Sequence, residues 1–124
     1  MLSLEYICGF VSGCGSFTQT TLNGKTQYIF QIKTSTDNHD LLEQIVVSLN
    51  LANRVYRYES HNQKYSQLLV RDRHSILNII IPAFNNQLFG SKGIQFNTWR
   101  DNILLNCSTW NYRNIKSRSN PQKI

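Results

Sequence analysis

Few side chains in this sequence have types and spacings suited to nucleophilic or metal chemistry. Cys8, Cys14 and Cys107 show no CxxC spacing, which argues against a zinc site or a disulfide framework. A nucleophile at Cys14 would need a positioned base. The three histidines fall at predicted turns or at a predicted helix start, and nothing in their spacing brings them to that cysteine: His39, His61 and His74. We therefore expect no cysteine catalysis, and no metal or cofactor held by these residues.

Basic and amide side chains suggest a different chemistry, the binding of polyanions. The 124 residues include 13 Lys or Arg and 7 Asp or Glu, and the net charge is +6. Such a balance favours nucleic acid first and an acidic membrane surface second. Lys, Arg and Gln contact phosphates and base edges, and alternation along the predicted strands would gather them on one polar sheet face. The predicted nucleic-acid-binding residues are Ser16, Thr18, Thr20, Gln27, Gln31, Lys33, Arg57, Gln67 and Arg71.

Two reservations apply to this polar face. An ordinary solvated sheet face is also polar, so the pattern by itself does not prove binding. The placement of Arg57 and Arg71 depends on strand register, because a shift of one residue moves a side chain to the other face of a sheet.

Hydrophobic periodicity predicts the elements that position these residues. A short apolar helix near the N-terminus leads into two strands, and Asn23-Gly24 between them is a strong hairpin signal. A helix follows, capped by the polar run 37–40, and then two more strands. A further helix is disturbed or ended by Pro82, a loop covers 85–93, and a last helix runs from about Phe96 to Leu105. The predicted strands are Ser16–Leu22, Gln27–Thr36, Arg54–Ser60 and Tyr65–Arg71.

The resulting order, α-β-β-α-β-β-α with a short final helix, predicts one α+β domain over residues 1–112. The remaining residues, 113–124, form a basic and polar tail, which we expect to be mobile. We find no apolar run near the ~20 residues of a membrane span and no leader pattern. The frequent Asn, Ile, Lys and Tyr suggest an AT-rich coding sequence, as in organelles, and hence a mitochondrial location.

The N-terminal apolar helix carries two glycines four residues apart. Gly9 and Gly13 would lie on one helix face and allow another backbone to approach closely. The run Gly13-Cys14-Gly15 then requires a sharp turn into the first strand. An ordinary core helix with a glycine at its end is the alternative interpretation.

The segment 9–17 resembles the signature of the LAGLIDADG homing endonucleases, in the form in which glycine and an aromatic residue precede Asp-Gly-Glu-Gly-Ser-Phe. The matching positions are Gly9, Phe10, Val11, Gly13, Gly15, Ser16 and Phe17. The segment 79–84 resembles the family's helix ending in Ile-Pro-x-Phe, and 88–93 followed by Phe96 and Trp99 resembles its later loop and aromatic pair. This resemblance covers about Tyr6 to Leu105 and implies the family's fold, with a four-stranded antiparallel sheet.

Two positions depart from the family signature. Ser12 stands where the family has Asp, and Cys14 stands where it has the acid that binds the catalytic metal. Mg²⁺ prefers hard oxygen ligands, so a thiol is a poor replacement. Glu5 lies at the other end of the helix and cannot substitute. Lys92 matches a family lysine tied to the solvent of the active site, although a surface lysine in a loop would look the same.

The resemblance also implies how the chain assembles. With one copy of the motif, the chain resembles the single-motif type, which forms homodimers through the motif helices. The expected interface residues are Ile7, Gly9, Phe10 and Gly13. The alternative is that these glycines pack inside one chain.

Together these observations predict a nucleic-acid-binding protein of LAGLIDADG type that has lost metal-dependent cleavage, without a membrane partner. Two other classes stay open. One is an active, site-specific double-strand DNA endonuclease that uses Mg²⁺. The other is an RNA-binding protein, such as a splicing cofactor or a component of an organellar ribosome, for which the basic tail would suit RNA phosphates.

Overall fold

The structure, a computed structural model, describes residues 1–106 apart from the side chain of Leu22. The predicted tail at 113–124 lies outside the described residues. The order of elements confirms the predicted α+β class, with the bounds α1 (Leu4–Cys14), β1 (Gly15–Leu22), β2 (Lys25–Thr34), α2 (His39–Leu49), β3 (Val55–Glu59), β4 (Lys64–Val70), α3 (Arg73–Ser75), α4 (Ile81–Phe84) and α5 (Gly90–Leu105). Within this part of the chain, no helix has the length and apolar character needed to span a membrane.

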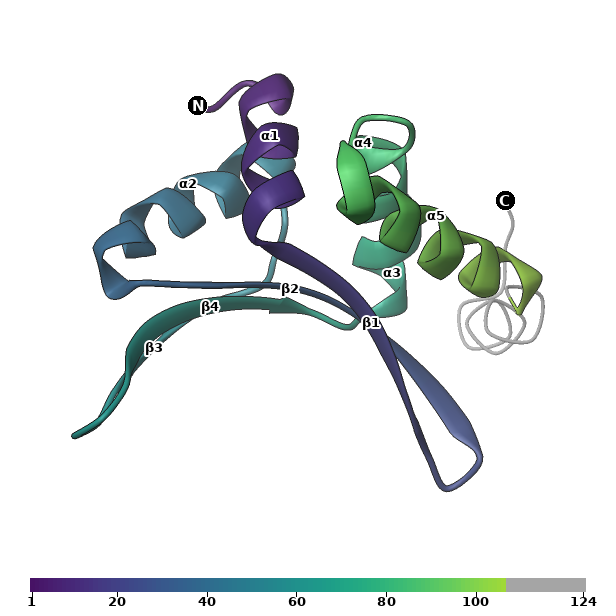
Figure 1. The fold of residues 1–124 in the computed structure, drawn as a ribbon, viewed down its shortest axis with the longest axis horizontal. Helices are drawn as coiled ribbons and strands as arrows, with labels where there is room; N and C mark the ends of the chain where they lie inside the picture. Colours follow the sequence, from purple (N-terminus) through teal and green to yellow (C-terminus); the bar gives the residue numbers. More distant parts are fainter. Residues whose placement is uncertain (107–124) are drawn as a thin grey trace.

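The four strands form one antiparallel sheet in the order β1-β2-β4-β3. All the helices lie on one side of this sheet (Figure 1). The sheet arches, and the two hairpins point away from the helices, so the side without helices is concave (Figure 1). We call this side the open face. Side chains alternate between the two sides of a strand, so the open face carries every second residue of each strand.

Local sequence signals explain most of these boundaries. Ser3 begins α1, because its side-chain oxygen accepts a hydrogen bond from the backbone N–H of Tyr6. Asn23 and Gly24 both have positive φ, 55° and 77°, as a tight hairpin turn requires. At the end of α2, Asn50 adopts the left-handed conformation that terminates many helices.

The helical run around Pro82 is disturbed, as the sequence predicts, but it is not ended there. The helix does not end at Pro82: a π-helical segment, Ile76–Ile80, joins α3 to α4, so the helical run continues to Phe84. Proline lacks an N–H and its ring crowds the carbonyl four residues earlier, and a wider turn before it relieves this conflict. The run continues because Ile76, Ile80 and Phe84 all point into the core.

The predicted loop at 85–93 is also shorter than expected. Helix α5 begins at Gly90, which has a positive φ of 64°, so the helix includes the Ser91-Lys92-Gly93 segment. Gly93 is required by close packing rather than by its φ, because a Cβ atom there would lie 2.9 Å from the carbonyl oxygen of Leu88. The sequence signal was misleading because two glycines and polar residues usually indicate a loop.

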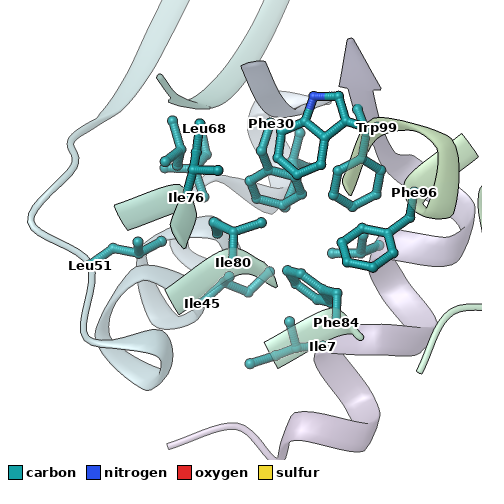
Figure 2. Packing of buried hydrophobic residues seen from close by; sticks show 14 of the residues in the cluster. Ile7, Phe30, Ile45, Leu51, Leu68, Ile76, Ile80, Phe84, Phe96 and Trp99 are labelled. Carbon is teal, nitrogen blue, oxygen red and sulfur yellow. The ribbon is translucent and has the colours of Figure 1, made fainter. Parts of the chain in front are cut away.

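An aromatic cluster fills the core between the sheet and the helices (Figure 2). Its centre is Phe17 on β1, whose ring centroid lies 5.0 Å from that of Trp99, 5.1 Å from Phe96, 5.2 Å from Phe30 and 6.2 Å from Phe84. These partners come from β2, α4 and α5. Tilted and edge-to-face rings at such distances interact favourably beyond the area that they bury, so Phe17 ties β1 to three separate elements.

Helix α5 also covers the exposed edge of the sheet. β1 is an edge strand, and its unpaired backbone groups need partners. The side-chain oxygen of Gln95 accepts a hydrogen bond of 3.0 Å from the Phe17 N–H. The indole N–H of Trp99 donates one of 2.7 Å to the Thr18 carbonyl. These contacts fix α5 to the strand that follows the motif helix.

The junction between α1 and β1 provides the first prediction. A Cβ atom at Gly15 would lie 2.6 Å from Val11 Cγ1 and 3.0 Å from the Val11 carbonyl oxygen, whereas one at Gly13 would meet no atom within 4 Å. Gly15→Ala should therefore lower the free energy of unfolding by about 1–3 kcal/mol. Gly13→Ala should leave it unchanged or raise it by up to about 1 kcal/mol, because alanine favours helix. Urea unfolding of dilute protein measures both, and equal stability of the two variants would contradict the packing described here.

Candidate nucleic-acid interface

The register of the sheet fixes which side chains share the open face. Phe30 and Ile32 of β2 and Leu68 and Val70 of β4 are fully buried under the helices. Their neighbours in sequence must therefore point to the open face. Two cross-strand rows result. One runs from Tyr56 through Gln67 to Lys33, and the other from Leu69 through Gln31 to Ser16.

Eight of the nine predicted binding residues lie on this face. On β1 and β2, Thr18 pairs with Ile29 and Thr20 pairs with Gln27, which extends the polar surface along the first hairpin. Arg71 follows β4 directly and lies with Gln27 and Tyr56 around one hollow of this face. The chain thus gathers amides, hydroxyls and cations from three strands and one strand end, all exposed or half-buried. Whether they bind nucleic acid stays a prediction.

The placement of Arg57 on this face is wrong. Arg57 pairs with the fully buried Ser66, so it points to the helix side of the sheet, and its guanidinium lies 3.9 Å from the Glu59 carboxylate. Val55 is the only aliphatic residue of β3, so it is the one residue whose type indicates which side of the strand faces the core. With Val55 on the core side, the next outward residue is Tyr56.

The same register reveals residues that the sequence analysis missed. Tyr56 and Tyr58 of β3 and Tyr65 of β4 point to the open face, since Tyr58 pairs with Tyr65 and Tyr56 with Gln67. Tyrosine is common in strands for packing reasons, so only the pairing partner distinguishes an inward ring from an outward one. Lys33 joins this group, with its ammonium nitrogen 4.2 Å from the centre of the Tyr65 ring.

The hydroxyl of Ser12, near the end of the motif helix, makes two hydrogen bonds. The Ser12 hydroxyl donates to the Cys8 carbonyl at 2.8 Å and accepts from the Phe89 N–H at 3.1 Å, so it links α1 to the start of α5. Cys14 is the last residue of α1 and its thiol is exposed. No group of three His, Cys, Asp or Glu residues that could hold a metal ion occurs within residues 1–106.

The other reactive groups of the described chain have structural partners. Cys8 is buried, and burial, together with the nearby charge of Glu5, raises the pKa of its thiol, which makes it a poor nucleophile. His39 bonds to Ser66 at 2.8 Å, and His74 contacts Asn78 at 3.1 Å. His61 lies exposed between β3 and β4. None of these contacts involves Cys14.

Lys92 lies in the first turn of α5, not in a loop, and is half-buried. Three residues before it, Phe89 donates its backbone N–H to Ser12. The lysine therefore belongs to the region where α5 begins beside the carboxyl end of α1. Its role at that position stays a prediction.

Helix α1 leaves one face uncovered within the described chain. Tyr6, Gly9, Phe10 and Gly13 share this glycine face, and Cβ atoms at either glycine would meet no atom within 4 Å. Tyr6 is 49% exposed and Phe10 half-buried. Packing of the glycines inside the described part of the chain is thereby excluded. The prediction for Ile7 is wrong: it is 1% exposed, because residues two apart on a helix point to opposite sides.

The fold and these two surfaces define a single α-β-β-α-β-β-α unit with an open sheet face and an uncovered glycine face on its first helix. A family model described as LAGLIDADG endonuclease matches residues 7–103. The chain therefore belongs to the LAGLIDADG endonuclease family. No curated protein matches the sequence significantly.

Solved structures of this family share the fold. I-GzeII in complex with its DNA target matches with a TM-score of 0.75 and 25% identity over 94% of this chain and 42% of that one. I-SmaMI bound to an uncleaved DNA target with calcium ions matches with a TM-score of 0.73 and 23% identity over 89% and 39%. I-LtrWI bound to target DNA matches with a TM-score of 0.73 and 24% identity over 86% and 38%. This chain thus spans about two fifths of each relative.

Proposed function

We propose that this chain binds duplex DNA through the open face of its sheet and does not cut it. The observation that carries the proposal is the arched, helix-free face with eight of the nine predicted polar and basic residues on it (Figure 1). Three solved relatives with this fold are described as bound to DNA targets. A two-stranded or larger β-ribbon fits the major groove, where base edges are readable.

The chemistry of the face suits both steps of recognition. Lys33 and Arg71 can neutralise phosphates, and this electrostatic attraction supplies affinity for any sequence. Gln31 and Gln67 each offer an amide donor and acceptor, the pair that matches adenine in the major groove. They lie on adjacent strands near the middle of the sheet, with Lys33 opposite Gln67. Affinity and sequence selection would thus come from neighbouring positions.

The end of the motif helix does not fit a catalytic metal. Hard divalent cations need carboxylate oxygens, and the resemblance places the acid of the family at position 14, where this chain has an exposed thiol. Ser12 adds no charge, and both hydrogen-bonding functions of its hydroxyl are occupied. We therefore assign no cleavage step to this site.

A second copy of the chain is the proposed partner of the glycine face. This face is apolar, and both of its glycines have open space beside them within residues 1–106. Close helix contacts of this kind depend on van der Waals packing between backbones. The chain spans only about two fifths of its solved relatives, so a homodimer would approach their size.

The first test compares two single-charge variants on opposite sides of the sheet. Lys33→Ala should weaken binding to a mixed-sequence DNA duplex and reduce the slope of log affinity against log salt by about 0.9, the value for one phosphate contact. Arg57→Ala removes the same charge from the helix side and should change the slope much less. Fluorescence anisotropy over a KCl series measures both. Equal losses of affinity and of salt slope in the two variants would show that net charge matters and that the open face does not. A wild type that does not bind the duplex would refute the proposal.

A second test concerns assembly. Gly13→Leu should prevent association because its side chain would hold two motif helices apart, while the fold of each chain survives in the open space around that position. Asn97→Leu, on the exposed surface of α5, is the control for added bulk. Sedimentation of the free and DNA-bound protein gives the mass. A wild type that is monomeric in both states would rule out the homodimer.

The third test concerns cleavage at position 14. Wild-type protein and Cys14→Glu are incubated with Mg²⁺ or Mn²⁺ and DNA from the locus that encodes the chain. We expect no cutting by the wild type, since losing a metal ligand removes several kcal/mol of transition-state stabilisation and each ~1.4 kcal/mol is tenfold in rate. Cutting by the wild type that stops when the metal is chelated would show an active endonuclease. Activity in Cys14→Glu alone would identify a lost ligand, and inactivity of both would implicate Ser12 as well.

A further inference from the structure

Three tyrosines form a continuous row at the β3 side of the open face. Tyr58 and Tyr65 are direct cross-strand partners, and their rings stack with centroids 4.7 Å apart and an angle of 29° between planes. Tyr56 lies two residues before Tyr58 on the same side of β3, with centroids 6.5 Å apart. Tyr56 and Tyr58 are 46% and 45% exposed. The row therefore presents aromatic surface to solvent on the face proposed to bind DNA.

Cations stand at both ends of this row. At one end, Lys33 lies over the Tyr65 ring, 4.2 Å from its centre. At the other end, Tyr56 borders an open hollow of about 660 Å³, which is also lined by Arg54 and Arg71. This volume lies in the range of about 300–1,000 Å³ that small-ligand sites occupy.

One acid lines the same hollow, and its oxygens are already engaged. Asp72 caps the helix that follows β4, where it accepts a hydrogen bond of 2.9 Å from the Ser75 N–H. Its other oxygen accepts one of 3.2 Å from the Asn53 side chain. The two arginines have no acidic partner within residues 1–106, so their charge remains available to a phosphate.

A role in stabilising the sheet accounts for some of these tyrosines but not for all of them. The Tyr58–Tyr65 stack is a cross-strand pair of the kind that strengthens an edge strand. Tyr56, however, faces Gln67 across the strands and gains no such partner. Base pairs in a duplex stack on one another and leave no ring face for a tyrosine, whereas unpaired bases stack readily on aromatic side chains.

We propose that the tyrosine row and the adjoining hollow form a subsite for unpaired nucleotides next to a bound duplex. Bases would stack on Tyr56 and Tyr58, and their phosphates would contact Arg54 beside the hollow, while Lys33 and Arg71 at the two ends of the row stay with the phosphates of the duplex. Every base can stack on an aromatic ring, so the subsite distinguishes unpaired from paired nucleotides rather than one base sequence from another. This inference rests on the proposed function, because it assigns one end of the open face to single-stranded nucleic acid.

The experiment uses a blunt DNA hairpin and the same hairpin with a short single-stranded extension, each also made as RNA. For wild-type protein the extension should raise affinity by roughly 5- to 100-fold for each stacked base. The double variant Tyr56→Val with Tyr58→Val keeps strand propensity and removes both rings. It should bind the extended hairpin no better than the blunt one. Tyr56→Phe with Tyr58→Phe keeps the rings and should retain the gain.

Two controls keep the result decisive. The single variant Tyr56→Val leaves the Tyr58–Tyr65 stack intact and should lose part of the gain even if the double variant folds poorly. 2-Aminopurine in the extension should lose fluorescence on binding to wild type and to the Phe variant, but not to the Val variants. The gain on adding the extension is compared within each variant, so a change in the affinity of a Val variant for the blunt hairpin does not affect the comparison.

The failures of the two proposals are distinguishable. A wild type that binds blunt and extended hairpins equally would overturn the subsite and leave duplex binding in place. Val variants that keep the full gain would also overturn it. Binding to neither hairpin would refute the proposed function and the subsite together. A gain seen only with RNA would assign the subsite to RNA strands, and an equal gain with both would assign it to unpaired nucleotides in general.

Discussion

The fold depends on a single constraint: the apolar surface of the chain must be buried on one side of the sheet. Phe17 shows how this is achieved, because its ring packs against partners from β2, α4 and α5 at once. Gln95 and Trp99 then satisfy the edge of the same strand with hydrogen bonds. With all helices held to that side, the opposite side is left bare and arched. The candidate interface is thus a consequence of how the core is packed.

Sequence reasoning was reliable where the signal was local. Asn23-Gly24 specified the first hairpin, and the polar and apolar alternation of β2 put Gln31 and Lys33 on the open face. It failed where the answer depended on distant contacts. The start of α5 was hidden by Gly90, which has a positive φ, and by Gly93, which close packing against Leu88 requires.

The site shows the same division. Arg57 and the tyrosines of β3 alternate, so one wrong choice of register put Arg57 on the open face in place of Tyr56 and Tyr58. A five-residue strand with one aliphatic side chain carries too little periodicity to settle the choice. The assignment of Ile7 to the glycine face could have been avoided, because helical spacing alone groups Tyr6 with Gly9 and Gly13 and places Ile7 opposite.

The exposure of Cys14 has a consequence for how such a protein can change over generations. Its thiol makes no hydrogen bond within residues 1–106 and lies outside the core. A side chain there lies outside the core, so an acid would cost only the ~0.3–1 kcal/mol of a negative charge at the C-terminal end of a helix. The residue type at position 14 can therefore change with little effect on the stability of the fold. A lineage could lose the acid, keep a folded chain, and regain the acid without passing through an unfolded ancestor.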